Sequence, residues 1–149
     1  DRDDGFICAF AGIDSSYFPG EENVCLLPSH PNRSASHIRD AIIKSANVKH
    51  VAVIISDTFG RPWREGHLNF AIGTAGIKPL QDYRDTIDAV GKIMRVTMTA
   101  TVDIVAAAAD LVSGKATNTP VSIVRGLNYG PSEQGMEDLL RTPEKDMFR

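Results

Sequence analysis

Apolar positions along the chain form short β-type runs separated by segments with helical spacing. Three β-branched or apolar runs predict strands, at residues 6–11, 51–55 and 120–124. A fourth apolar run, residues 69–77, contains Gly73 and Gly76. Glycines inside a strand indicate a bulge or the close approach of another backbone. We therefore expect a bulged strand there.

Two segments have the spacing of amphipathic helices. Residues 34–46 can begin at an N-cap formed by Ser34 or Ser36, and one face carries Ile38, Ala41, Ile42 and Ser45. Residues 101–112 have an alanine-rich centre, and Gly114 follows as a C-cap. The order of helix and strand predicts a mixed α/β fold, in which strands near Phe6, Val51 and Val121 pack against both helices.

The remaining segments contain turn residues. Residues 15–33 are predicted to be a loop with a short extended piece at 24–27, and residues 57–66 a loop with Gly60, Pro62 and Gly66. The tail from Gly130 is polar and acidic, and we expect it to pack loosely. Neither an internal repeat nor a domain boundary is evident, so residues 1–149 are interpreted as a single region.

Composition and charge exclude several classes of protein. Of 149 residues, 42% are hydrophobic and 23% charged, which is typical of a soluble globular chain. The longest apolar runs are far shorter than the roughly 20 residues that span a bilayer, so no membrane helix is expected. The net charge of −3 gives no basic field for nucleic acid. The chain begins with aspartate and lacks a signal-peptide pattern, so we expect it to start inside a longer gene product.

The two cysteines, Cys8 and Cys25, are not arranged as zinc ligands. They favour two reduced thiols in a cytoplasmic protein, with a disulfide between them as the alternative. The four histidines form no metal-ligand pair and stand beside no nucleophile motif, so a serine or cysteine hydrolase is not indicated.

Two aspartates follow apolar runs, Asp14 after residues 6–13 and Asp57 after residues 51–56. In open α/β sheets, ligands collect beyond the carboxyl ends of strands. Two carboxylates there can share Mg²⁺ or Mn²⁺, with an oxygen from Ser56 or Thr58 added. The alternative is that both aspartates only cap turns.

Two further groups of residues suit anions. Arg61 and Arg64 flank Trp63, the only tryptophan, and their planar guanidinium groups match phosphate or carboxylate. The alternative is a surface loop whose Trp63 covers an edge of the core. Gly114 and Lys115 follow a helix and can contact phosphate, although the glycine pattern of a P-loop is absent. Here the alternative is a glycine cap followed by a solvated lysine.

Several motifs together carry a resemblance to a known family. They are SDTFGRPWREG at 56–66, AIGTAG at 71–76, DYR at 82–84, AAAADLVSGK at 106–115 and PVSIVRG at 120–126. DGFICA at 4–9, AGID at 11–14, LLR at 139–141 and DMF at 146–148 extend the match over nearly the whole chain. With these motifs the sequence resembles the F420-0 gamma-glutamyl ligase family, whose fold is not one of the common superfolds.

The resemblance implies a ligase that adds L-glutamate to F420-0, first at the lactyl carboxylate and then through γ-linked amides. It implies GTP as co-substrate, Mg²⁺ or Mn²⁺, a response to K⁺ in some members, and a homodimer. An amide forms from a carboxylate only after activation, which phosphoryl transfer from GTP supplies as an acyl phosphate. Cations and arginines would neutralise the charge of that transfer.

The resemblance also implies roles for individual residues. Asp14 and Asp57 match the aspartates that hold a first metal, and Thr58 and Lys115 match positions at a second metal. Tyr17 matches a nucleotide contact, as does a segment comprising Val112, Ser113, Gly114, Lys115, Ala116, Thr117 and Asn118. We further assign Arg61 and Arg64 a catalytic role toward phosphate or substrate carboxylate.

The sequence departs from the family pattern at four positions. Phe10 and Tyr17 stand where the family has asparagine, Ile104 stands where it often has an acidic residue, and Lys115 stands where some members have glutamine. Lys115 places a cation where a metal ligand is expected. The family also carries an N-terminal segment before this region. Two alternatives follow: a sister ligase acting on another carboxylate, or a non-catalytic nucleotide-binding relative.

Overall fold

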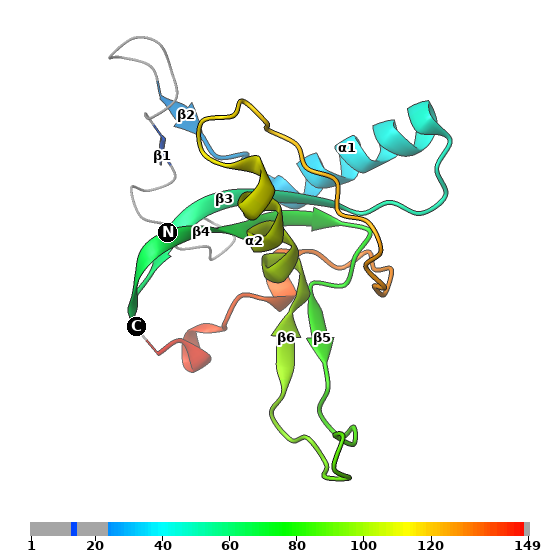
Figure 1. Ribbon diagram of the computed structural model, residues 1–149, viewed down its shortest axis with the longest axis vertical. Helices are drawn as coiled ribbons and strands as arrows, with labels where there is room; N and C mark the ends of the chain where they lie inside the picture. The colour runs from blue at the N-terminus through cyan, green and yellow to red at the C-terminus, as the bar shows by residue number, and fades with distance from the viewer. Residues whose placement is uncertain (1–12, 15–23, 148–149) are drawn as a thin grey trace.

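The computed structural model describes residues 13–14 and 24–147 and confirms a mixed α/β class (Figure 1). Its strands form three antiparallel pairs. The pairs are β1 (Ile13–Asp14) with β2 (Cys25–Leu26), β3 (Val53–Arg61) with β4 (Arg64–Ala75), and β5 (Leu80–Asp82) with β6 (Met98–Ala100). The helices are α1 (Pro31–Ala46), α2 (Thr101–Ser113) and the 3-10 turns η2 (Met136–Asp138) and η3 (Pro143–Lys145). The extended piece expected at residues 24–27 is confirmed as β2.

The β3–β4 hairpin is the centre of the fold. Its register runs from Val53↔Ala75 to Arg61↔Arg64, so Pro62 and Trp63 alone form the turn. The predicted loop at 57–66 is therefore wrong. Cross-strand pairing and the stacking of Phe59 on Phe70, with ring centroids 5.4 Å apart, outweigh the local turn signals of the glycines and proline. The register shift between residues 55 and 56 confirms the bulge expected in the second strand.

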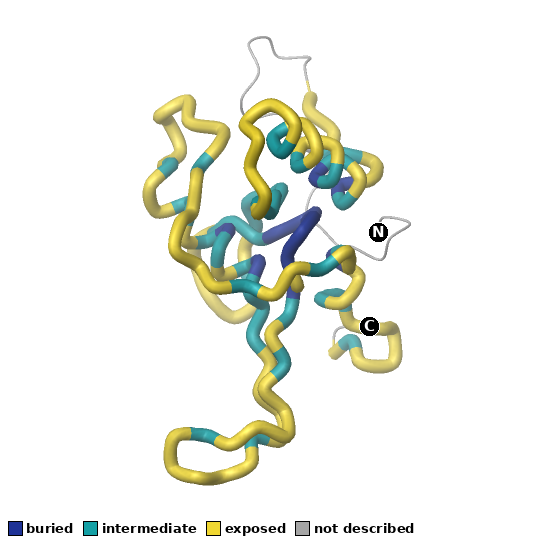
Figure 2. The backbone as a smooth tube through the Cα atoms, turned by 90° about the vertical axis from the view of Figure 1, so that its right-hand side faces the viewer, coloured by how far each residue is buried: buried dark blue, intermediate teal, exposed yellow. Residues whose placement is uncertain are grey.

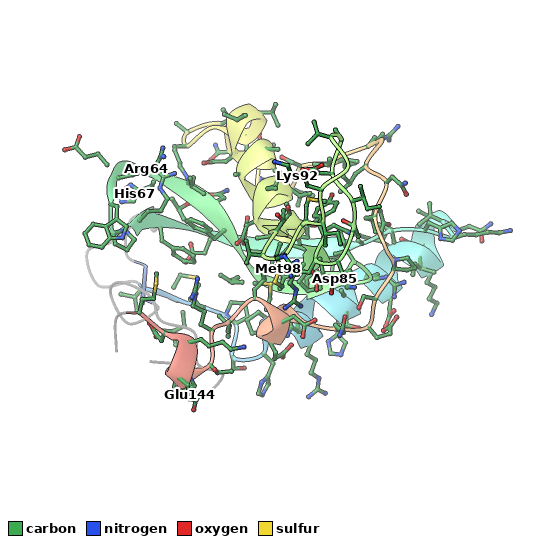
Figure 3. The ribbon with its side chains drawn as sticks, turned by 90° about the horizontal axis from the view of Figure 1, so that it is seen from below. Arg64, His67, Asp85, Lys92, Met98 and Glu144 are labelled. Atoms are coloured by element: carbon green, nitrogen blue, oxygen red, sulfur yellow. The ribbon has the colours of Figure 1, made fainter. Side chains whose placement is uncertain are left out.

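The two long helices cover opposite faces of this hairpin (Figure 1, Figure 3). Side chains alternate between the faces along each strand, but the bulge at Ile72, which has no partner on β3, reverses this alternation between Ala71 and Gly73. Ala71 lies on the α2 face, where it joins Val102 in the core, whereas Gly73 lies against Pro31 at the start of α1. The close backbone approach expected at the strand glycines is thus confirmed at Gly73.

The core is small and lies where β4, α2 and the C-terminal segment meet. It consists of Ala71, Ile77, Val102 and Met136, with Ala52, Ile54, Tyr129 and Leu139 packed around it. Figure 2 shows the buried positions gathered at the middle of the molecule. Residues 80–100, which comprise β5, β6 and the segment that joins them, form an arm that is mostly exposed; we call it the β5–β6 arm. Met136 comes from the polar tail, so that segment contributes to the core. Among the described residues, none of the helices has the length and apolarity needed to cross a bilayer.

The helix ends differ in how well the sequence predicts them. α1 begins at Pro31 rather than at Ser34 or Ser36, because proline at the first helical position has no N–H to leave unpaired. Its buried positions are Pro31 and Ala35, whereas Ile38 and Ala41 are exposed. The C-cap at Gly114 is confirmed, with a φ of 62° and its N–H donating to the carbonyl of Asp110.

The strand predicted at residues 120–124 is wrong. The segment forms no ladder with any described strand, and both Val121 and Ile123 are exposed. A β-branched run becomes a strand only where another strand edge offers hydrogen-bond partners. The strand predicted at residues 6–11 lies outside the described residues.

Gly73 offers a test of the α1–β4 contact. A Cβ at this position would lie 2.5 Å from the carbonyl carbon of Pro31, so α1 must move away from the hairpin. We expect Gly73→Ala to lower the free energy of unfolding by about 1–3 kcal/mol in urea denaturation. Gly60→Ala is the matched control, since its Cβ would meet only His67 Cδ2, at 3.7 Å. Equal stability of the two variants would contradict this packing.

Candidate functional site

Four side chains, from β3, β4, α2 and the loop that follows α2, meet on the α2 face of the hairpin. Thr58 and Asn69 oppose each other across β3 and β4, and the Thr58 hydroxyl donates to Asn69 Oδ1 over 2.7 Å. Lys115 Nζ donates to Thr58 Oγ1 at 2.8 Å and to Asn69 Oδ1 at 3.4 Å. The same ammonium pairs with Asp110 Oδ1 at 3.2 Å. We call Thr58 Oγ1, Asn69 Oδ1 and Asp110 Oδ1 the oxygen cluster.

The end of α2 places the lysine. Gly114 terminates the helix in a conformation that glycine adopts without steric cost, and the next residue turns back over the hairpin. Asp110 lies one helical turn earlier, with its side chain 19% exposed against 53% for Lys115. Thr58 and Lys115 are 57 residues apart in sequence, and the family resemblance placed both at one metal position. The structure brings these two predicted residues together.

Asp57 occupies a different surface from Thr58. It lies at the middle of β3, so the prediction that it ends a strand is wrong; the hairpin pairing carries the strand on to Arg61. Strand alternation turns its side chain to the face opposite Thr58, with Oδ1 accepting from the Thr58 N–H at 2.8 Å. Asp14 is the last residue of β1, paired with Cys25, and its side chain lies outside the described residues.

The two arginines lie at the outer end of the hairpin. Arg61 and Arg64 are paired across the turn, and Arg61 Nη2 donates to the Glu65 carbonyl at 3.3 Å. Figure 3 shows Arg64 beside His67 at this end. Arg61 is three residues beyond Thr58, or about 10 Å along an extended strand. The arginines therefore do not join the oxygen cluster. Trp63 is 82% exposed, so it does not cover a core edge.

The segment predicted to contact nucleotide forms a loop fixed to α2. The Ser113 hydroxyl donates to the Ala109 carbonyl at 2.9 Å and lies 2.7 Å from Ser122 Oγ. Thr117 Oγ1 donates to the Ser113 carbonyl, and Asn118 has a φ of 53°. Val112 is exposed beside this loop. Tyr17 and Phe10 lie outside the described residues.

Sequence reasoning missed three polar residues around this face. Asn69 and Asp110 complete the oxygen cluster, and Asp103 accepts a hydrogen bond from the Ala71 N–H at 3.0 Å. A polar residue inside the apolar run 69–77 was the only available signal for Asn69. Asp110 and Lys115 are neighbours only because the helix ends at Gly114, which the sequence does predict.

Asp103 gives a pH-dependent prediction. Burial raises the pKa of its carboxyl above the ordinary value of 3.8, and this outweighs the hydrogen bond from Ala71, which lowers it. The native state therefore keeps this proton to higher pH than the unfolded chain. Stability from this group is present below pH 3.8 and is lost as the pH rises through the native pKa. Asp103→Asn keeps an oxygen acceptor for Ala71 and does not ionise.

We expect the free energy of unfolding of Asp103→Asn, relative to the wild type, to rise from pH 3 toward neutrality and then level off. Urea denaturation of both proteins across this pH range measures the difference directly. Loss of stability at low pH that comes from other groups affects both proteins equally, so it cancels in the difference between their free energies of unfolding. A difference that stays constant with pH would contradict the burial of the carboxylate.

The donor groups of this face determine whether it fits a divalent metal ion. In the described part of the chain, no three histidine, cysteine, aspartate or glutamate side chains converge. The oxygen cluster does contain hard oxygen donors of the type that Mg²⁺ and Mn²⁺ prefer. The ammonium of Lys115 already lies among those oxygens, and a charged lysine has no lone pair to offer a metal. As it stands, the oxygen cluster does not fit a metal ion.

Comparison with known proteins identifies the family to which this chain is similar. A sequence profile described as F420-0:Gamma-glutamyl ligase matches residues 1–126. The chain is 42% identical over 146 residues to the coenzyme F420:L-glutamate ligase of Haloarcula marismortui, covering 97% of this chain and 56% of that protein. It is 42% identical over 148 residues to the same-named protein of Methanothermobacter thermautotrophicus, covering 97% of this chain and 58% of the relative. The chain thus spans less than three fifths of these relatives.

Proposed function

Because the chain belongs to the F420-0:gamma-glutamyl ligase family, we propose that it is part of an enzyme that adds L-glutamate to F420-0 in coenzyme F420 biosynthesis. The observation that carries this proposal is the match over residues 1–126, together with relatives named as coenzyme F420:L-glutamate ligases that align with 97% of the chain. We assign the reaction to amide formation driven by GTP. The substrates are the carboxylate of F420-0 and the amine of L-glutamate.

The proposed reaction proceeds in two steps that balance. The carboxylate oxygen of F420-0 attacks the γ-phosphorus of GTP, and GDP leaves. The glutamate nitrogen then attacks the acyl carbon, inorganic phosphate leaves, and the nitrogen loses a proton. Both partners of the first step are anions, so fixed positive charge has to offset their repulsion.

Within this proposal, the residues divide by position. The carboxylates of Asp14 and Asp57 would hold Mg²⁺ or Mn²⁺, which supplies positive charge to the phosphates. The loop at 112–118 and Tyr17 would contact the nucleotide. Arg61 and Arg64 would meet phosphate or the substrate carboxylate from the hairpin end, which is supported by the exposure of Arg64 and the bidentate geometry of guanidinium groups. K⁺ would act as an additional monovalent cation.

We also propose a homodimer that buries the apolar surface of α2 and the segment after it. Ile104, Leu111, Val121 and Ile123 are all exposed. Large apolar side chains exposed on neighbouring segments of a chain are candidates for burial in a protein interface. Sedimentation of the full-length protein at micromolar concentrations tests this proposal. A monomer at all concentrations would contradict it.

The deciding experiment for the ligase uses the full-length protein with F420-0, L-glutamate, GTP and Mn²⁺. Mass spectrometry of the deazaflavin is expected to show a gain of one or two glutamyl units. GTP cleavage without that gain would indicate ligation to another carboxylate. If GTP is not cleaved and no glutamyl unit is gained, the proposal is contradicted, and a nucleotide-binding relative is favoured.

A further inference from the structure

We propose that Lys115 is a built-in cation of the oxygen cluster: its ammonium occupies a position that would otherwise accept a divalent metal ion. The wild-type cluster therefore binds no metal, and removal of the lysine charge creates a metal site. This inference depends on the geometry of the described residues. Its test needs no substrate, so it stands or fails separately from the proposed ligase activity.

The number and placement of acceptors support this assignment. A lysine ammonium has three N–H donors and no acceptor. Among the residues that the structure describes, three oxygens surround it, namely Thr58 Oγ1 at 2.8 Å, Asn69 Oδ1 at 3.4 Å and Asp110 Oδ1 at 3.2 Å. They are a hydroxyl, an amide carbonyl and a carboxylate, which are also hard ligands for Mg²⁺ and Mn²⁺. The ammonium thus has the contacts expected of a bound cation.

The oxygens are held in place without the lysine. Thr58 and Asn69 are opposed in the register of β3 and β4 and are linked by their own 2.7 Å hydrogen bond. Asp110 projects from the last turns of α2, and its side chain is mostly buried. Removal of the lysine therefore leaves three oxygens on regular secondary structure, and this pre-organisation favours capture of another cation.

Lys115 and a metal ion exclude each other at this position. A divalent ion bound to Thr58 Oγ1 and Asp110 Oδ1 would lie within a few ångströms of the ammonium, and two positive charges at that separation repel each other. Lys115→Gln removes the charge and offers an amide oxygen as a fourth ligand. Water completes the coordination of Mg²⁺ and Mn²⁺ in most protein sites.

The test is a titration of Mn²⁺ into the full-length protein, without nucleotide, with free Mn²⁺ followed by electron paramagnetic resonance. We expect Lys115→Gln to bind one more Mn²⁺ per chain than the wild type, and Lys115→Arg to bind no more than the wild type. Lys92→Gln is the matched control, because Lys92 is exposed in the segment that joins β5 to β6, and this arm extends away from α2 in Figure 1. It should leave the count unchanged.

A double variant locates the additional ion. Asp110→Asn in the Lys115→Gln background is expected to abolish the extra Mn²⁺, whereas Asp110→Asn alone should leave the wild-type count unchanged. Circular dichroism establishes that each variant is folded before the count is made. The proposal is overturned if folded Lys115→Gln binds no additional ion, or if Asp110→Asn alone lowers the wild-type count.

Discussion

Asp57→Asn is expected to lower the rate of metal-dependent ligation by roughly 10²–10³-fold, the range seen when one charge-stabilising group is removed from an active site. The substitution exchanges a carboxylate for a neutral amide, so the proposed metal loses an anionic ligand. In the wild type, the Thr58 N–H donates a 2.8 Å hydrogen bond to Asp57 Oδ1. The amide oxygen of asparagine can accept the same hydrogen bond. The effect should therefore appear in activity and metal affinity rather than in stability.

The measurement is the initial ligation rate at increasing Mn²⁺ concentrations, together with thermal unfolding. Asp85→Asn is the matched control, because Asp85 is exposed on the β5–β6 arm (Figure 3). It should retain the wild-type rate and Mn²⁺ dependence. If Asp57→Asn also retains both, Asp57 does not hold the metal. A large fall in melting temperature would instead assign it a structural role.

Asn32→Ala is expected to cost about 2–4 kcal/mol of unfolding free energy, because it leaves two backbone donors without their acceptor. Asn32 Oδ1 accepts from the Thr74 N–H at 3.0 Å and from the Met136 N–H at 3.3 Å. Its Nδ2 donates to Glu137 at 2.9 Å. This one side chain links α1, β4 and η2, and Met136 beside it belongs to the core.

Urea denaturation measures the loss, with Asn128→Ala as the control at an exposed asparagine. Asn32→Asp separates the two functions of the side chain. It keeps the oxygen acceptor, loses the donor to Glu137 and places two carboxylates together. It should be destabilised at neutral pH and recover in part as the pH falls and carboxylates are protonated. Equal stability of Asn32→Ala and Asn128→Ala would show that this link contributes nothing.

The sequence predicted the parts of the fold that depend on neighbouring residues. The helix at 101–112 and its end at Gly114 follow from alanine content and from a glycine that accepts a positive φ. The strand beginning near Val51 follows from its β-branched run, although the structure starts it at Val53. The motif resemblance also identified the family, whose profile matches residues 1–126 and whose relatives align with 97% of the chain.

The parts of the fold and of the candidate site that the sequence did not predict depend on contacts between residues distant in sequence. Gly60 and Pro62 indicated a loop, yet residues 57–61 form a strand because β4 pairs with residues 57–59 and with Arg61, on either side of an irregularity at Gly60. Residues 120–124 have the composition of a strand but pair with no described strand. Thr58 and Lys115 could be assigned to one position by resemblance, while Asn69, Asp110 and Asn32 could not. A local pattern fixes the conformations a segment prefers; hydrogen-bond ladders and ion pairs require a second segment, and only the folded chain determines which one is adjacent.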